Sequence, residues 1–155
     1  MIQITGDISK LENLRIKLVS ISKFSISPYK KPLLALAQQQ TDSNFAGQED
    51  SEGNKWPRLK ASTIKQKERK GFSSEALVKT GALKAARLQS NEAGQNTLLT
   101  NYTDSKIARI ASYQQLGTKR IPVRSYIARG VKFSEGAKDI IAKGEMERIS
   151  NILSG

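Results

Sequence analysis

The residue types that most often carry out chemistry are scarce in this chain. It contains no cysteine and no histidine. Histidine is the side chain that most often moves protons near neutral pH and is the commonest metal ligand, and without cysteine there is no thiolate metal site or disulfide. Four acids, Asp42, Glu49, Asp50 and Glu52, lie in one polar stretch over 38–54. A solvated acidic surface explains them more simply than a catalytic pair.

Other catalytic patterns are also missing. The glycines at 6, 71, 81, 94 and 117 are isolated, so neither the P-loop spacing nor GxGxxG occurs. Serine and threonine are plentiful, but a serine nucleophile would need a lysine base placed beside it by the fold. We therefore expect no enzyme activity, no cofactor and no metal.

The charge points instead to binding. The formal net charge is +12, with ten basic residues against Glu68 and Glu75 over 55–88 and five basic residues against none over 119–132. Such a surplus favours nucleic acid, acidic protein surfaces or anionic membranes at low salt.

The segment KWPRLKASTIKQKERKG at 55–71 concentrates this charge beside the chain's one tryptophan. In one interpretation Lys65, Lys67, Arg69 and Lys70 neutralise phosphates while Trp56 stacks on a base. In another the helix is solvated and Trp56 anchors it to the fold. Helical spacing wraps the cations around the helix and forms no single stripe, which favours general electrostatics over groove reading. Both nucleic-acid binding and a protein-assembly surface stay open on composition.

The length of 155 residues fits one domain, with 37% hydrophobic residues to build its core. We expect a single domain over 1–155, with a polar loop at about 41–54 whose composition allows mobility. No run approaches the ~20 apolar residues that cross a bilayer, and the first residues do not resemble a signal peptide. We expect a soluble protein that is intracellular when synthesised, with no membrane partner.

Apolar spacing and turn residues predict the elements. Helices are expected over 9–22, where Ser9 and Glu12 form a capping box, over 32–40, over 63–70 capped by Ser62, from Ser74 to about 88, and from Ser134 to the end. A β-hairpin is expected from 96–101 and 106–111, and an extended or edge strand over 123–127. The predicted fold class is α+β, with a small antiparallel sheet or hairpin flanked by N-terminal, central and C-terminal helices.

Several residue blocks, in order, resemble one family. They are Gly53, Trp56, Leu59, Thr63 and Lys67; then Leu77, Thr80, Gly81 and Leu83; then Ala111, Gln115 and Gly117; then Pro122 and Arg124. Their spacing is similar to that of the phage virion morphogenesis proteins, the tail-completion group typified by Mu-like and related contractile-tailed phages. The opening MIQITGD and the helix after it also resemble the family's start. Ile110 and Gln114 depart from the tyrosine and histidine usual in the third block.

The resemblance implies a non-enzymatic structural protein that completes the tail and joins it to the head at the virion neck. Its partners would be other tail or neck proteins and further copies of itself, in an oligomer whose subunit number stays open, six being usual for rings that cap a tail tube, with non-specific contact to DNA also open. It would be made in the host cytoplasm and end in the virion.

Residue roles follow from the same resemblance. The expected structural anchors are Trp56, Leu59, Leu77, Thr80, Gly81, Leu83, Gly117 and Pro122. The expected partner or DNA contacts are Lys65, Lys67, Arg69, Lys70, Lys119, Arg120 and Arg124. The alternative function is that of a basic nucleic-acid-binding protein that uses the 55–88 and 119–132 clusters.

Overall fold

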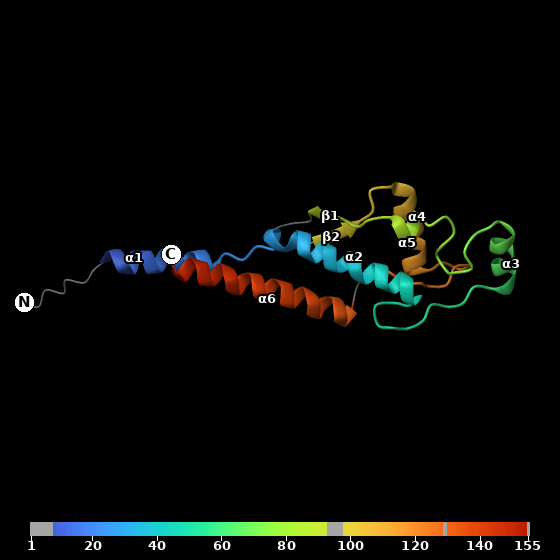
Figure 1. The fold of residues 1–155 in the computed structure, drawn as a ribbon. Helices are drawn as coiled ribbons and strands as arrows, with labels where there is room; N and C mark the ends of the chain where they lie inside the picture. The colour runs from blue at the N-terminus through green and yellow to red at the C-terminus, as the bar shows by residue number, and fades with distance from the viewer. Residues whose placement is uncertain (1–7, 93–97, 129, 155) are drawn as a thin grey trace, which may run out of the picture.

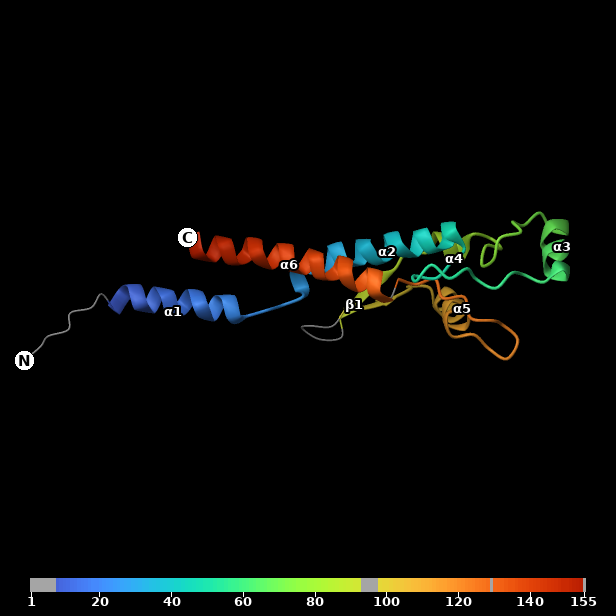
Figure 2. The same ribbon diagram turned by 90° about the horizontal axis from the view of Figure 1, so that it is seen from below.

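The structure is a computed structural model that describes residues 8–92, 98–128 and 130–154. The molecule is elongated (Figures 1 and 2), and its elements are named as in Figure 1. The helices are α1 (Ile8–Ser22), the 3-10 helix η1 (Ser27–Tyr29), α2 (Lys30–Gly47), α3 (Ala61–Arg69), α4 (Ala82–Ala85), α5 (Ser105–Leu116) and α6 (Gly130–Ser154). The strands are β1 (Gln89–Glu92) and β2 (Leu98–Asn101).

Two long helices form the spine of the molecule. α2 and α6 run antiparallel and side by side, with α1 and the C-terminal end of α6 at one end and α3 at the other (Figures 1 and 2). Two glycines of α6 allow close packing. A Cβ at Gly136 would lie 3.0 Å from Leu36 Cδ2 of α2, and a Cβ at Gly144 would overlap the ring of Tyr29.

The aromatic core lies at the C-terminal half of α2. Tyr126 is 0% exposed and Phe45 is 2% exposed, and their ring centroids are 4.8 Å apart. The Trp56 ring meets Phe45 edge to face at 5.6 Å. Leu83 and Leu88 complete this side of the core.

The predicted α+β class is wrong, because the fold is mainly helical. Within the described ranges the only strands are β1 and β2, which pair antiparallel from Gln89 with Asn101 to Glu92 with Leu98. The predicted second strand, 106–111, lies inside α5. Asp104 caps that helix by accepting hydrogen bonds from the backbone N–H groups of Lys106 and Ile107, which favours helix over strand for a short run that fits either pattern.

Other boundaries also differ from the prediction. The expected polar loop over 41–54 is helical as far as Gly47, because the buried Thr41, Asn44 and Phe45 continue the inner face of α2. α3 begins at Ala61 with Lys60 as its N-cap, so Ser62 is not the cap. Of the helix expected over 74–88, only Ala82–Ala85 is helical. Residues 123–127 have no regular secondary structure and pair with no strand in the described part of the chain.

The N-terminal helix is confirmed over Ile8–Ser22, and the C-terminal helix begins at Gly130, four residues before Ser134. The start MIQITGD, residues 96–97 of the predicted strand and Arg129 lie outside the described residues. Across the helices that the structure describes, none combines the length and apolarity needed to span a membrane.

Candidate functional site

Residues from separate parts of the sequence meet at a segment without regular secondary structure, 123–128, which we call the strap. The indole N–H of Trp56 donates to the carbonyl of Ser125 at 3.0 Å. Arg124 Nε and Nη2 both donate to the carbonyl of Pro57, at 3.1 and 2.9 Å. The strap therefore fixes both residues of the Trp-Pro pair.

α5 holds the strap from one side. The Gln114 carbonyl accepts from the Arg124 backbone N–H at 2.8 Å. The Gln115 side chain donates to Ser125 Oγ at 2.8 Å and accepts from the Tyr126 backbone N–H at 3.2 Å. One glutamine thus binds both a donor and an acceptor of the strap.

α2 holds the strap from the other side. Asn44 Nδ2 donates to the Tyr126 carbonyl at 2.9 Å, and Thr41 Oγ1 accepts from the Ala128 N–H at 3.1 Å. The polar groups of a buried backbone need hydrogen-bond partners. In a sheet the neighbouring strand provides them, and here the side chains of Thr41, Asn44 and Gln115 do so. This explains how residues 124–126 are buried without belonging to a strand.

Arg124 is therefore an internal residue. It is 6% exposed, and burial lowers the pKa of its guanidinium. Its guanidinium donates twice to the Pro57 carbonyl, so Arg124, expected as a partner or DNA contact, is engaged inside the chain. Trp56, at 7% exposed, occupies the buried position expected of an anchor.

The connection 117–122 leads from α5 into the strap. Gly117 has φ +73°, and a Cβ there would lie 2.9 Å from Val123 Cγ2 and 3.2 Å from the Ile121 carbonyl. Glycine suits this position on both counts. Pro122, expected as an anchor, is exposed, as are Lys119 and Arg120 at the tip of the connection.

The basic helix α3 buries none of its residues. Lys65, Arg69 and Lys70 are exposed, whereas Lys67 Nζ donates to the carbonyls of Glu75 and of Val78, the latter at 2.9 Å. Burial lowers the pKa of Lys67. Lys67 thus holds the 75–78 segment through two hydrogen bonds. α3 and the 117–122 connection lie at the same end of the molecule (Figures 1 and 2).

A cleft of about 410 Å³ separates α3 from α5 and is closed at its base by residues 77–83. Its apolar lining comes from Leu59, Leu77, Val78, Leu83, Ile107 and Ile110. Leu77 and Gly81 have positive φ angles, 61° and 81°, so the segment turns sharply at both. Thr80, also in the lining, is exposed, and its hydroxyl accepts from the Ala82 N–H at 3.4 Å. Five of the expected anchors thus come together at this cleft: Leu59, Leu77, Thr80, Gly81 and Leu83.

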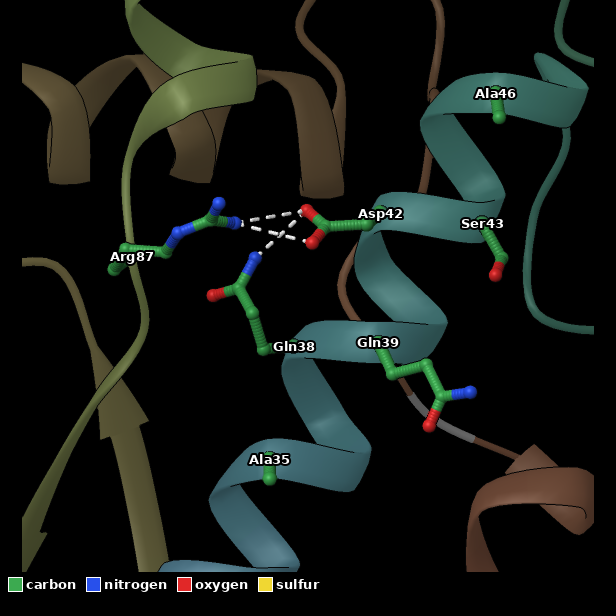
Figure 3. Close-up of a pocket in the computed structure, with 7 residues that line it drawn as sticks. All are labelled: Ala35, Gln38, Gln39, Asp42, Ser43, Ala46 and Arg87. Carbon is green, nitrogen blue, oxygen red and sulfur yellow. Dashed lines mark hydrogen bonds and ion pairs between the residues drawn. The ribbon is translucent and has the colours of Figure 1, made fainter.

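A second, more open depression of about 610 Å³ lies on the surface of α2 (Figure 3). Arg87 and Asp42 form an ion pair of 3.0 Å there, and Gln38 donates to Asp42 at 2.8 Å while accepting from the Leu88 N–H at 2.9 Å. These groups satisfy one another and fasten the chain before β1 to α2. Asp42 is consequently a paired helix residue.

The carboxylates of Glu49 and Asp50 in the polar stretch are also engaged, whereas Glu52 is exposed. Glu49 pairs with Lys55 at 2.7 Å, and Asp50 accepts from the backbone N–H groups of Glu52 and Asn54, each at 2.9 Å. Within the described residues no three His, Cys, Asp or Glu side chains cluster as metal ligands. The Asp50 carboxylate thus stabilises the turn over 50–54.

The opposite end of the molecule is an arm, which we define as α1 with residues 145–154 of α6. Arg148 donates to the carbonyls of Ser20 and Ile21 at 3.0 Å each, and Lys17 Nζ donates to the Leu153 carbonyl at 3.2 Å. These contacts involve Lys17, Ser20 and Ile21, in the second half of α1. Its large apolar side chains stay exposed: Leu11 65%, Leu14 49%, Ile16 52%, Leu18 56% and Val19 44%.

Sequence reasoning missed the polar residues of α2 that hold the strap. Thr41 and Asn44 fall at helical spacing with the buried Ala37 and Phe45, so extending the 32–40 helix by two turns would have placed both on its inner face. The polarity of these residues is typical of a loop, although their spacing is helical.

Comparisons with protein-family models, with curated proteins and with solved structures found no match to this chain.

Proposed function

We propose that the chain is a non-enzymatic structural protein of a phage particle that completes the tail and joins it to the head at the virion neck. It acts through contacts with other tail or neck proteins and with further copies of itself, in an oligomer whose subunit number stays open. It is made in the host cytoplasm and incorporated into the virion.

The observation that carries an assembly role is the uncovered apolar surface of α1. Soluble monomers rarely expose contiguous apolar patches larger than a few hundred Å² without a binding purpose. Leu11, Leu14 and Leu18 recur at three-to-four spacing on the arm, and each is about half exposed or more. A neighbouring subunit that packed on this stripe would remove it from water.

The particular assembly, the phage neck, is what the resemblance to the tail-completion proteins implies. Trp56, Gln115 and Arg124 come from three of the matching blocks, and all three bind the strap or belong to it. Their spacing in the sequence is thus consistent with one structural unit, which supports treating the blocks as a single pattern.

The test is to delete the gene in the phage that produces the protein and to image the lysate. We expect full heads and unjoined tails, restored to whole particles by the wild-type gene in trans. Intact particles in normal number would contradict the proposal.

The exposed cations at the α3 end favour a second candidate, a nucleic-acid-binding protein. Lys65, Arg69, Lys70, Lys119 and Arg120 lie on α3 and on the connection beside it. A salt titration with duplex DNA of arbitrary sequence separates the two. Tight binding near physiological salt, with a steep fall of log K against log salt, would favour this candidate because phosphate contacts release counterions.

A further inference from the structure

The cleft between α3 and α5 has an apolar floor that the described chain leaves partly open. Leu83 is 8% exposed at its base, whereas Ile110 at its mouth is 48% exposed. Its volume, about 410 Å³, falls in the range of natural ligand pockets. Contact with a further apolar group would remove the half-exposed Ile110 side chain from water, which is favourable.

The cleft also carries positive charge. Lys67 and Lys79 belong to its lining, which contains no aspartate or glutamate. An ammonium has three donors, and two of those on Lys67 are directed to the Glu75 and Val78 carbonyls. Lys79 Nζ lies 5.6 Å from the centre of the Phe72 ring and is exposed. Lys70 and Lys106 lie one turn away from lining residues, on the same faces of α3 and α5.

The chemistry of the lining is unsuited to nucleic acid. Single strands are held by aromatic faces on which bases stack, and duplexes by cations that track phosphates. No aromatic side chain lines the cleft, and the cations flank aliphatic side chains. A protein segment with an apolar side chain next to a carboxylate fits this lining better than a nucleic acid with its phosphate backbone.

We propose that this cleft binds a segment of a partner protein in which a large apolar side chain stands next to an aspartate or glutamate. The apolar side chain contacts Leu83 and Ile110, and the carboxylate lies between Lys67 and Lys79. The Gln114 amide also lines the cleft, and its oxygen has no hydrogen-bond partner in the described part of the chain, so a small rotation offers it to a backbone N–H of the segment. The inference is independent of the arm, which lies at the other end of the molecule.

A library of random 12-residue peptides displayed on yeast provides the probe. The intact chain is used as bait, and clones that also bind the Ile110→Glu variant are removed. We expect the surviving sequences to share an acidic residue next to Leu, Ile, Phe or Met. In fluorescence anisotropy a surviving peptide should bind Lys79→Glu and Ile110→Glu at least tenfold more weakly than wild type.

Lys143→Glu, which makes the same charge change at an exposed site on α6, should leave peptide affinity within twofold. Circular dichroism confirms that each variant folds. The proposal is overturned if no clone distinguishes wild type from Ile110→Glu, if the survivors are basic or lack an apolar residue, or if Lys143→Glu weakens binding as much as Lys79→Glu. It is also overturned if labelled single-stranded DNA competes for the cleft with a higher affinity that Ile110→Glu abolishes.

Discussion

The indole N–H of Trp56 donates to the carbonyl of Ser125 at 3.0 Å, across 69 positions of sequence. This bond joins the Trp-Pro pair to the strap, and Arg124 completes the link by returning two bonds to Pro57. The two segments are thereby fixed in register without a shared sheet.

Trp56→Ala should lower the free energy of unfolding by ~3 kcal/mol or more, since it removes a buried ring from contact with Phe45. Trp56→Phe should keep much of the packing but leave the Ser125 carbonyl unpaired, at a cost of about 1–3 kcal/mol. Denaturant unfolding measures both. Tyr113→Ala is the matched control, because Tyr113 is 47% exposed. Equal losses for Trp56→Ala and Tyr113→Ala would contradict the anchor role.

The bidentate bond from Arg124 to Pro57 gives a second prediction. Arg124→Lys should cost about 1.5 kcal/mol or more of unfolding free energy, because a lysine cannot reproduce the fork that places Nε and Nη2 on one oxygen. Arg120→Lys, at an exposed position, should change it by less than about 0.5 kcal/mol. If Arg124 serves a partner instead, its replacement will leave chemical denaturation unchanged and affect only assembly.

How much of this was predictable depends on where each residue finds its partners. The N-terminal helix was predictable because its apolar spacing is local, although the helix begins at Ile8, so the predicted cap Ser9 lies inside it. The strap was not, because its backbone is satisfied by side chains of Gln115 and of Thr41 and Asn44, the last two of which are 82 or more positions away in sequence. A strand prediction assumes a neighbouring strand, and nothing in VRSYI reveals that side chains take its place.

The same limit applies to the candidate site. The number of cations in the sequence does not distinguish Lys67, which donates hydrogen bonds to two carbonyls, from Lys65 and Lys70, which are exposed. Burial of Trp56 could be anticipated from its type, whereas burial of Arg124 depends on the tertiary position of Pro57.

Gly144 of α6 gives a third prediction. Gly144→Ala would normally stabilise a helix by about 1 kcal/mol, but here the added methyl would overlap the ring of Tyr29, whose hydroxyl is held by Glu145 at 2.6 Å. Overpacking of this kind costs about 1–3 kcal/mol, so we expect net destabilisation in thermal unfolding. Gly136→Ala meets only the flexible end of Leu36 and should be tolerated better. A stabilised Gly144→Ala would show that the contact is loose.

Glu145 gives a pH-dependent prediction. Its pKa is lowered from the ordinary value near 4.5 by hydrogen bonds from Arg148, at 2.6 Å, and from Tyr29. A carboxyl whose pKa is lower in the folded state stabilises the protein above its unfolded pKa, and this contribution is lost as the pH falls through the folded pKa. Unfolding free energy measured between pH 7 and pH 3 should therefore fall less steeply in Glu145→Gln than in wild type. Superimposable pH profiles would contradict this assignment.

The arm gives the prediction on which the assembly role depends most directly. If copies of the chain associate through α1, the protein should sediment as an oligomer, and Leu11→Glu with Leu18→Glu should reduce it to the 17.1 kDa monomer by placing charges in the buried stripe. Leu116→Glu is the matched control, since Leu116 is 75% exposed on α5, outside the arm. A wild-type protein that stays monomeric at high concentration would exclude self-association, and an unchanged mass for the double variant would move the interface away from α1. Loss of the oligomer in Leu11→Glu/Leu18→Glu alone would identify the arm as the surface through which subunits meet.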